Sequence, residues 1–162
     1  MDQDYHAQPH DKTLLRRAIA LSVESHAAGQ HPFGALLADA EGRVLIEALN
    51  GFLPAGDGTA HAERLVATRA CIELPAETRA GATLYSSAEP CAMCAGAIYW
   101  AGIGRVVFGL SEHRMKTMIG PHPDNLTMDL PCRTVFAAGQ RAIAVVGPML
   151  EDEAAAPHHG AW

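Results

Sequence analysis

Two short segments combine a histidine, a glutamate and two cysteines in a spacing that suits a metal site. Residues 59–63 read Thr-Ala-His-Ala-Glu, and residues 90–94 read Pro-Cys-Ala-Met-Cys. Cysteines three positions apart at a helix start point their sulfurs the same way, and the first-turn amides favour the thiolate. Thiolate and imidazole are ligands that Zn²⁺ binds well. We therefore predict that His61, Cys91 and Cys94 bind one Zn²⁺ per chain.

Glu63 is the predicted catalytic residue beside this metal. Three protein ligands leave a fourth position for water, which is the pattern of a catalytic zinc. Residues two apart in a helix interior face different sides, but in the first turn His61 and Glu63 can both lie around the helix end. Glu63 would take a proton from the water, whose pKa zinc lowers, and deliver it to the substrate. The alternative is a non-catalytic zinc-binding module. The carboxyl group of Glu63 beside an open coordination position of the metal argues against this alternative.

The segments that must position these residues alternate between helical and extended patterns. A hairpin is expected from two apolar runs joined by the turn residues 39–42. Strands that then alternate with helices imply parallel neighbours in one mixed sheet with helices on both faces. Residues 115–139 predict an irregular loop with at most one short helix, and residues 154–162 a tail. The predicted helices are 12–27, 60–74 and 90–101, and the predicted strands are 33–38, 44–49, 82–87, 105–109 and 142–146.

Length, charge and hydropathy narrow the class of protein. The 162 residues predict a single domain, residues 1–162, with a core of about 12–150 between a loose start and the tail. A net charge of −6 argues against a nucleic acid partner, because phosphate binding depends on Lys and Arg. The chain has no apolar run of the roughly 20 residues that cross a bilayer and no signal-peptide pattern, so no membrane association and a cytoplasmic location are expected.

With these motifs in view, the chain resembles the cytidine deaminase-like superfamily. It is most similar to the branch of guanine deaminases, bacterial tRNA adenosine deaminases and fungal-type cytosine deaminases, over about residues 32–109. The matching segments include Pro-Phe-Gly-Ala at 32–35, residues 59–63 and residues 87–98. The resemblance implies an α/β fold, a three-layer α/β/α sandwich around a five-stranded mixed sheet. It also implies a homodimer and hydrolytic deamination of a nucleobase or nucleoside with release of ammonia.

The resemblance also implies contacts with the substrate. Asn50 matches an Asn that ends the second strand and hydrogen-bonds the substrate, Phe33 could stack on a base, and Glu89 could offer its backbone carbonyl. The predicted substrate-binding set is Asn50, Phe33, Ala62, Glu89, His113 and Trp100, and weaker candidates are His122, Glu112 and Asp124.

The identity of the heterocycle is less constrained by the sequence. Residues 97–100 and the pair Glu112-His113 are similar to guanine deaminases, but Met115 stands where that group places an Asp soon after the pair. Residues 103–109 are similar to tRNA adenosine deaminases instead. An amino-purine is favoured, and a cytosine-type pyrimidine and a tRNA adenosine remain alternatives.

Overall fold

A five-stranded mixed sheet forms the centre of the molecule. The computed structural model describes residues 7–162, and its strands lie in the order β2-β1-β3-β4-β5. β1 pairs antiparallel with β2 and β3, whereas β3, β4 and β5 are parallel. The predicted hairpin and mixed sheet are confirmed. The strands are β1 Gly34–Ala38, β2 Val44–Leu49, β3 Thr83–Ala88, β4 Arg105–Leu110 and β5 Ala144–Val146.

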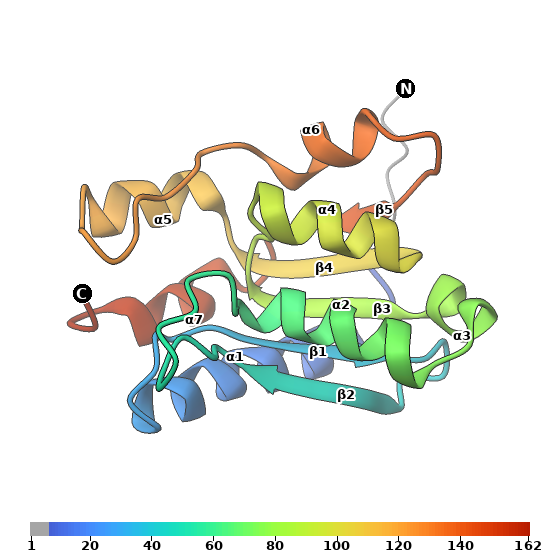
Figure 1. The fold of residues 1–162 in the computed structure, drawn as a ribbon, viewed down its shortest axis with the longest axis horizontal. Helices are drawn as coiled ribbons and strands as arrows, with labels where there is room; N and C mark the ends of the chain where they lie inside the picture. The colour runs from blue at the N-terminus through green and yellow to red at the C-terminus, as the bar shows by residue number, and fades with distance from the viewer. Residues whose placement is uncertain (1–6) are drawn as a thin grey trace.

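Helices cover both faces of this sheet, which confirms the three-layer sandwich (Figure 1). α1 and α7 pack on one face, while α2, α4 and α6 lie over the other. In the described part of the chain, no helix is long and apolar enough to cross a membrane. The helices are α1 Asp11–Ala27, α2 Ala62–Glu73, α3 Ala76–Gly81, α4 Ala92–Ala101, α5 Glu112–Ile119, α6 Cys132–Ala137, α7 Glu151–Ala155 and the 3-10 turn η1 Ala156–His158.

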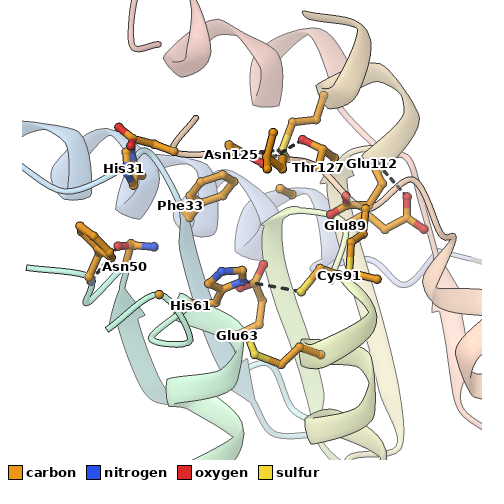
Figure 2. A pocket seen from close by; sticks show the side chains of 18 of the residues that line it. His31, Phe33, Asn50, His61, Glu63, Glu89, Cys91, Glu112, Asn125 and Thr127 are labelled. Carbon is orange, nitrogen blue, oxygen red and sulfur yellow. Dashed lines mark hydrogen bonds between the residues drawn. The ribbon is translucent and has the colours of Figure 1, made fainter. Parts of the chain in front are cut away.

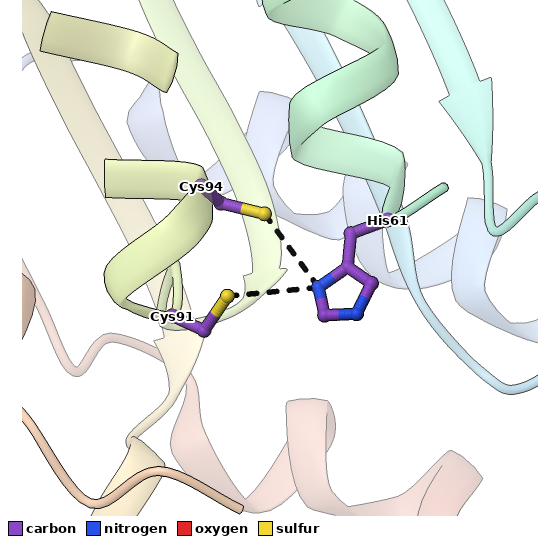
Figure 3. Close-up of side chains that lie close together, drawn as sticks. All are labelled: His61, Cys91 and Cys94. Atoms are coloured by element: carbon purple, nitrogen blue, oxygen red, sulfur yellow. Dashed lines mark hydrogen bonds between the residues drawn. The ribbon is translucent and has the colours of Figure 1, made fainter. Parts of the chain in front are cut away.

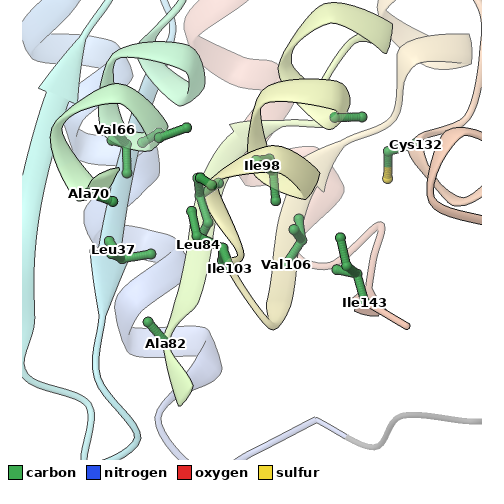
Figure 4. Close-up of a cluster of buried hydrophobic side chains, with 14 of the residues drawn as sticks. Leu37, Val66, Ala70, Ala82, Leu84, Ile98, Ile103, Val106, Cys132 and Ile143 are labelled. Carbon is green, nitrogen blue, oxygen red and sulfur yellow. The ribbon is translucent and has the colours of Figure 1, made fainter. Parts of the chain in front are cut away.

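The strands carry apolar side chains on both sides because helices cover both faces of the sheet. Side chains alternate along a strand, so Leu37 faces the α2 and α4 layer, while Leu36 faces the α1 layer. Leu84 and Tyr85 on β3 divide in the same way. Figure 4 shows Leu37 and Leu84 with Val66 of α2 in the first of these clusters. This packing holds the starts of α2 and α4 at the same edge of the sheet.

The helix α3 was not predicted, and three further sequence predictions need correction. α2 and α4 each begin two residues later than predicted, so His61 and Cys91 are N-cap residues in extended conformation. Residues 115–139 contain most of α5 and all of α6, where at most one short helix was expected. The predicted tail, residues 154–162, instead contains the end of α7 and the turn η1. These elements are too short for periodicity to mark them, and tertiary packing stabilises them.

Candidate active site

Two helix starts bring the three predicted zinc ligands together. Nδ1 of His61 lies 3.6 Å from Sγ of Cys91 and 3.6 Å from Sγ of Cys94, as Figure 3 shows. All three ligand atoms lie within 4.8 Å of one another. Tetrahedral zinc with Zn–S of about 2.3 Å and Zn–N of about 2.0 Å would separate N and S by about 3.6 Å. The residues therefore fit one Zn²⁺ ion.

The surroundings of the two cysteines favour a thiolate on Cys91 and a thiol on Cys94. A hydrogen bond from Cys94 is the main cause that lowers the pKa of Cys91 to about 4, and His61 contributes further. The same hydrogen bond, together with burial, raises the pKa of Cys94. One thiolate is thus preformed at the N-terminus of α4, which suits binding of a soft divalent cation.

Glu63 lies beside the ligands in the first turn of α2. Its side chain is buried, and Ser86 Oγ on β3 donates a hydrogen bond of 2.9 Å to its Oε1. Its other oxygen, Oε2, lies 3.8 Å from Sγ of Cys94. Burial raises the pKa of Glu63, which is the direction needed for a carboxyl that exchanges protons near neutral pH.

A cavity of about 480 Å³ opens on the ligands, and Figure 2 shows its walls. Its volume lies within the range usual for small-molecule sites, roughly 300–1,000 Å³. His61, Glu63 and Cys91 line it on the metal side. The rest of the lining includes aromatic rings from His31, Phe33 and Trp162 and polar groups from Asn50, Glu89, Glu112, Asp124 and Asn125.

Half of the predicted substrate-binding residues line this cavity. Phe33, Asn50 and Glu89 do so. Oδ1 of Asn50 accepts a hydrogen bond of 3.0 Å from the Phe52 amide, which leaves the side-chain NH₂ of Asn50 for a ligand. Both carboxylate oxygens of Glu89 accept backbone hydrogen bonds, so its side chain has a structural role.

The other three do not reach the cavity of the same chain. Trp100 is 84% exposed on the outer side of α4, because Cys94, Ile98 and Ala101 form the buried side of that helix. His113 is exposed and pairs with Asp129, with 3.0 Å between Nδ1 and Oδ2. Ala62 is buried in the core beneath α2.

Trp162 is one of several cavity residues that sequence reasoning missed. Its indole stacks on the His31 ring at 4.6 Å with an interplanar angle of 12°. It also meets the His122 ring edge-on at 5.6 Å. The sequence prediction treated this residue as part of a tail, and no periodic pattern around it signals a tertiary contact.

The comparisons with known proteins agree with this geometry. Residues 8–110 match the family model of the cytidine and deoxycytidylate deaminase zinc-binding region. The chain belongs to this family. It is therefore a hydrolytic deaminase of a zinc-binding family, and His61, Cys91 and Cys94 form a group that could hold one zinc ion.

The relatives of this deaminase carry names that specify different bases, cytosine and guanine. It is 42% identical over 155 residues to a probable cytosine deaminase of Schizosaccharomyces pombe, which covers 94% of this chain and 92% of that protein. It is also 42% identical over 103 residues to a guanine deaminase of Bacillus subtilis, which covers 63% of this chain and 65% of that protein. The solved guanine deaminase of Nitrosomonas europaea superposes with a TM-score of 0.72 at 24% identity, covering 96% of this chain and 85% of that one, and shows the shared fold.

Proposed function

We propose that this deaminase acts on a free nucleobase or a similarly small amino-heterocycle, with a guanine-like amino-purine as the favoured substrate. The supporting observation is the cavity beside the zinc ligands. Phe33 and Trp162 offer apolar faces for a planar ring. The carboxyl groups of Glu112 and Asp124 offer partners for ring N–H and amino groups.

The residues of the site have distinct tasks in this reaction. When bound, Zn²⁺ supplies a Lewis acid that makes water acidic enough to lose a proton near neutral pH. Glu63 accepts that proton and returns it to a ring nitrogen, while the oxygen of water adds to the carbon that carries the amine. Glu63 then takes the remaining proton of the added hydroxyl group and delivers it to the amine, so that the C–N bond breaks, ammonia leaves and a carbonyl group remains. The buried hydrogen bond from Ser86 holds Oε1 of Glu63 in place for these transfers.

A cytosine-type pyrimidine is the second candidate substrate. The observation in its favour is the long match to the probable cytosine deaminase, which extends beyond the zinc motifs over nearly the whole chain. A tRNA substrate is less well supported, because the net charge of −6 opposes phosphate binding.

We also propose that the protein forms a homodimer. Trp100 on α4 and Ile72 on α2 expose large apolar side chains, which a second copy of the chain would cover. Sedimentation of the zinc-loaded protein at two concentrations tests this directly. A monomer at micromolar concentration would contradict the proposal.

The substrate proposal is tested by ammonia release from the zinc-loaded enzyme. The panel is guanine, adenine, cytosine, their nucleosides and an anticodon stem-loop that contains adenosine. We expect guanine to show the highest kcat/KM and the nucleosides and RNA to react slowly. A preference for cytosine would favour the second candidate, and turnover of only the RNA would contradict a small-molecule substrate.

A further inference from the structure

Among the residues that the structure describes, a nearly buried glutamate whose carboxyl has no hydrogen-bonding partner lies in the wall of the cavity. Glu112, the first residue of α5, is only 5% exposed and lines the cavity. Its backbone N–H is hydrogen-bonded, but within residues 7–162 no donor, acceptor or cation pairs with its side-chain carboxyl. Burial of an unpaired polar group costs free energy, and such a group in a cavity is stabilised when a ligand supplies the missing hydrogen bonds.

Glu89 fixes the position of this carboxyl. Oε2 of Glu89 accepts a hydrogen bond of 2.9 Å from the Glu112 amide, and its Oε1 accepts one of 2.9 Å from the Cys132 amide. The Glu89 amide in turn donates to the Leu110 carbonyl at 2.7 Å. These bonds tie the end of β3 to the starts of α5 and α6. Glu89 and Glu112 lie next to each other in Figure 2, on the same side of the cavity as Cys91.

The environment of Glu112 favours its neutral form. Burial is the main cause that raises the pKa of Glu112 to about 9. A neutral carboxyl both donates and accepts a hydrogen bond, whereas a carboxylate only accepts. A ring edge with an N–H beside a carbonyl oxygen is complementary to the neutral form at both positions.

We propose that Glu112 is a specificity-determining residue that pairs through its carboxyl with the lactam edge of the substrate ring, the N–H next to the carbonyl oxygen. This inference rests on the proposed function. It assigns recognition of the substrate ring to the carboxyl group of Glu112. A site built to hydrogen-bond such an edge rejects an analogue without it, since the buried carboxyl then stays unpaired. Guanine has the edge, and 2-aminopurine has the same amine but lacks the carbonyl and its neighbouring N–H.

The experiment compares these two bases in two measurements. Steady-state kcat/KM is measured for wild type, Glu112→Ala and Glu112→Gln. Binding is measured by calorimetry in a zinc-loaded Glu63→Gln background, where turnover does not intervene. Glu77→Gln is the matched control, because Glu77 is exposed on α3 outside the cavity. If the wild type prefers cytosine, cytosine and 4-aminopyrimidine replace the purine pair, since 4-aminopyrimidine lacks the carbonyl.

We expect kcat/KM of the wild type to be about 100-fold or more higher for guanine than for 2-aminopurine. This is the size of effect expected for two hydrogen bonds to a buried group. Glu112→Ala should reduce that ratio at least about tenfold, while Glu112→Gln should keep most of it, because a carboxamide also donates and accepts. A ratio that stays unchanged in Glu112→Ala would overturn the proposal, as would equal loss in both variants. Thermal unfolding and zinc content show whether a variant is folded.

The binding measurement separates this proposal from the proposed function. If guanine binds selectively through Glu112 but no base releases ammonia, the role of Glu112 stands and the proposed substrate is wrong. If the base with the lactam edge, guanine or cytosine, binds no better than its analogue without the carbonyl in the Glu63→Gln background, the role of Glu112 is wrong.

Discussion

The indole N–H of Trp162 donates a hydrogen bond of 3.1 Å to Nδ1 of His158. Nδ1 can accept only in the neutral imidazole, so the proton of His158 lies on Nε2. This bond fixes the plane of the indole, which forms part of the cavity wall and stacks on His31. A segment that reads as a tail in the sequence therefore shapes the candidate active site.

Replacement of Trp162 by Ala should weaken substrate binding. The change removes an aromatic face of the cavity and the edge contact with His122, so we expect KM to rise about tenfold, with a smaller effect on kcat. Trp162→Phe keeps an aromatic ring but loses the N–H that donates to His158. The KM of this variant should lie between those of the wild type and Trp162→Ala. Steady-state kinetics on all three proteins check this. Equal KM values would show that the indole does not contact the substrate.

His158 should make stability depend on pH. Burial lowers its pKa to about 4 in the folded protein, from about 6.5 in the unfolded chain. The neutral form is favoured by folding, so its contribution is complete above about pH 6.5 and is lost as the pH falls toward 4. Relative to His158→Asn, which does not titrate, the wild type should lose on the order of 3 kcal/mol over that window.

Urea unfolding of both proteins at pH 7, 6, 5 and 4 measures this difference. Other groups, including the zinc ligands, titrate alike in the two proteins, so the difference between them isolates His158. A difference that stays constant with pH would show that the imidazole is not held neutral by its surroundings.

The regular elements of the fold were predictable because each leaves a local pattern. The apolar runs around Leu36 and Leu84 mark buried strands, and Gly102 ends α4 in left-handed conformation with φ of 76°, as a helix-closing glycine does. α5, α6 and α7 were not predictable in this way. They are short, and their stability comes from contacts such as the hydrogen bonds that Glu89 accepts from the starts of α5 and α6.

The candidate site divides along the same line. The predicted zinc ligands and Glu63 lie in two compact motifs, whose residue types and spacing together indicate the chemistry. Trp162 enters the cavity through contacts with residues more than a hundred positions away, such as His31. For Trp100 the local sequence was misleading. Residues 97–100 are similar to guanine deaminases and predicted a substrate contact, but the Trp100 side chain is exposed to solvent. Local sequence specifies ligands well and cavity walls poorly.

Replacement of Cys91 by Ser should abolish stoichiometric zinc binding. The change removes the thiolate with the lowered pKa, and two remaining ligands hold Zn²⁺ much more weakly. Elemental analysis after dialysis should give about one zinc per wild-type chain and far less in the variant. Cys71→Ser is the matched control, because Cys71 is exposed on α2 and lies outside the ligand group. Full zinc occupancy in Cys91→Ser would exclude it as a ligand.

Replacement of Glu63 by Gln should separate metal binding from catalysis. The carboxamide fills the same space but does not exchange protons, so we expect normal zinc content and a fall in kcat of about 10²–10⁴. Ser86→Ala removes only the hydrogen bond to Oε1 and should have a milder effect. Ammonia release per zinc-loaded chain is the measurement. Near-normal turnover by a metal-loaded Glu63→Gln enzyme would contradict the proton-transfer role.

A buried ion pair remote from the zinc group should contribute strongly to stability. Asp11 is fully buried in α1, and its carboxylate accepts hydrogen bonds from both terminal nitrogens of Arg105, at 2.8 and 2.6 Å, and from the Tyr85 hydroxyl at 2.7 Å. Arg105 begins β4, at the opposite end of the sheet from Glu89 and the cavity.

Asp11→Asn would leave the Arg105 guanidinium buried without its counter-charge. Loss of one partner of a buried pair should lower the free energy of unfolding by about 3–5 kcal/mol. Arg16→Gln breaks the exposed pair with Glu153 and should change stability far less, because solvent screens that pair. Urea unfolding at pH 7 gives both values, and kcat at a temperature where each variant is folded should stay near that of the wild type. A small loss in Asp11→Asn would mean that water or backbone groups solvate Arg105 once the carboxylate is gone.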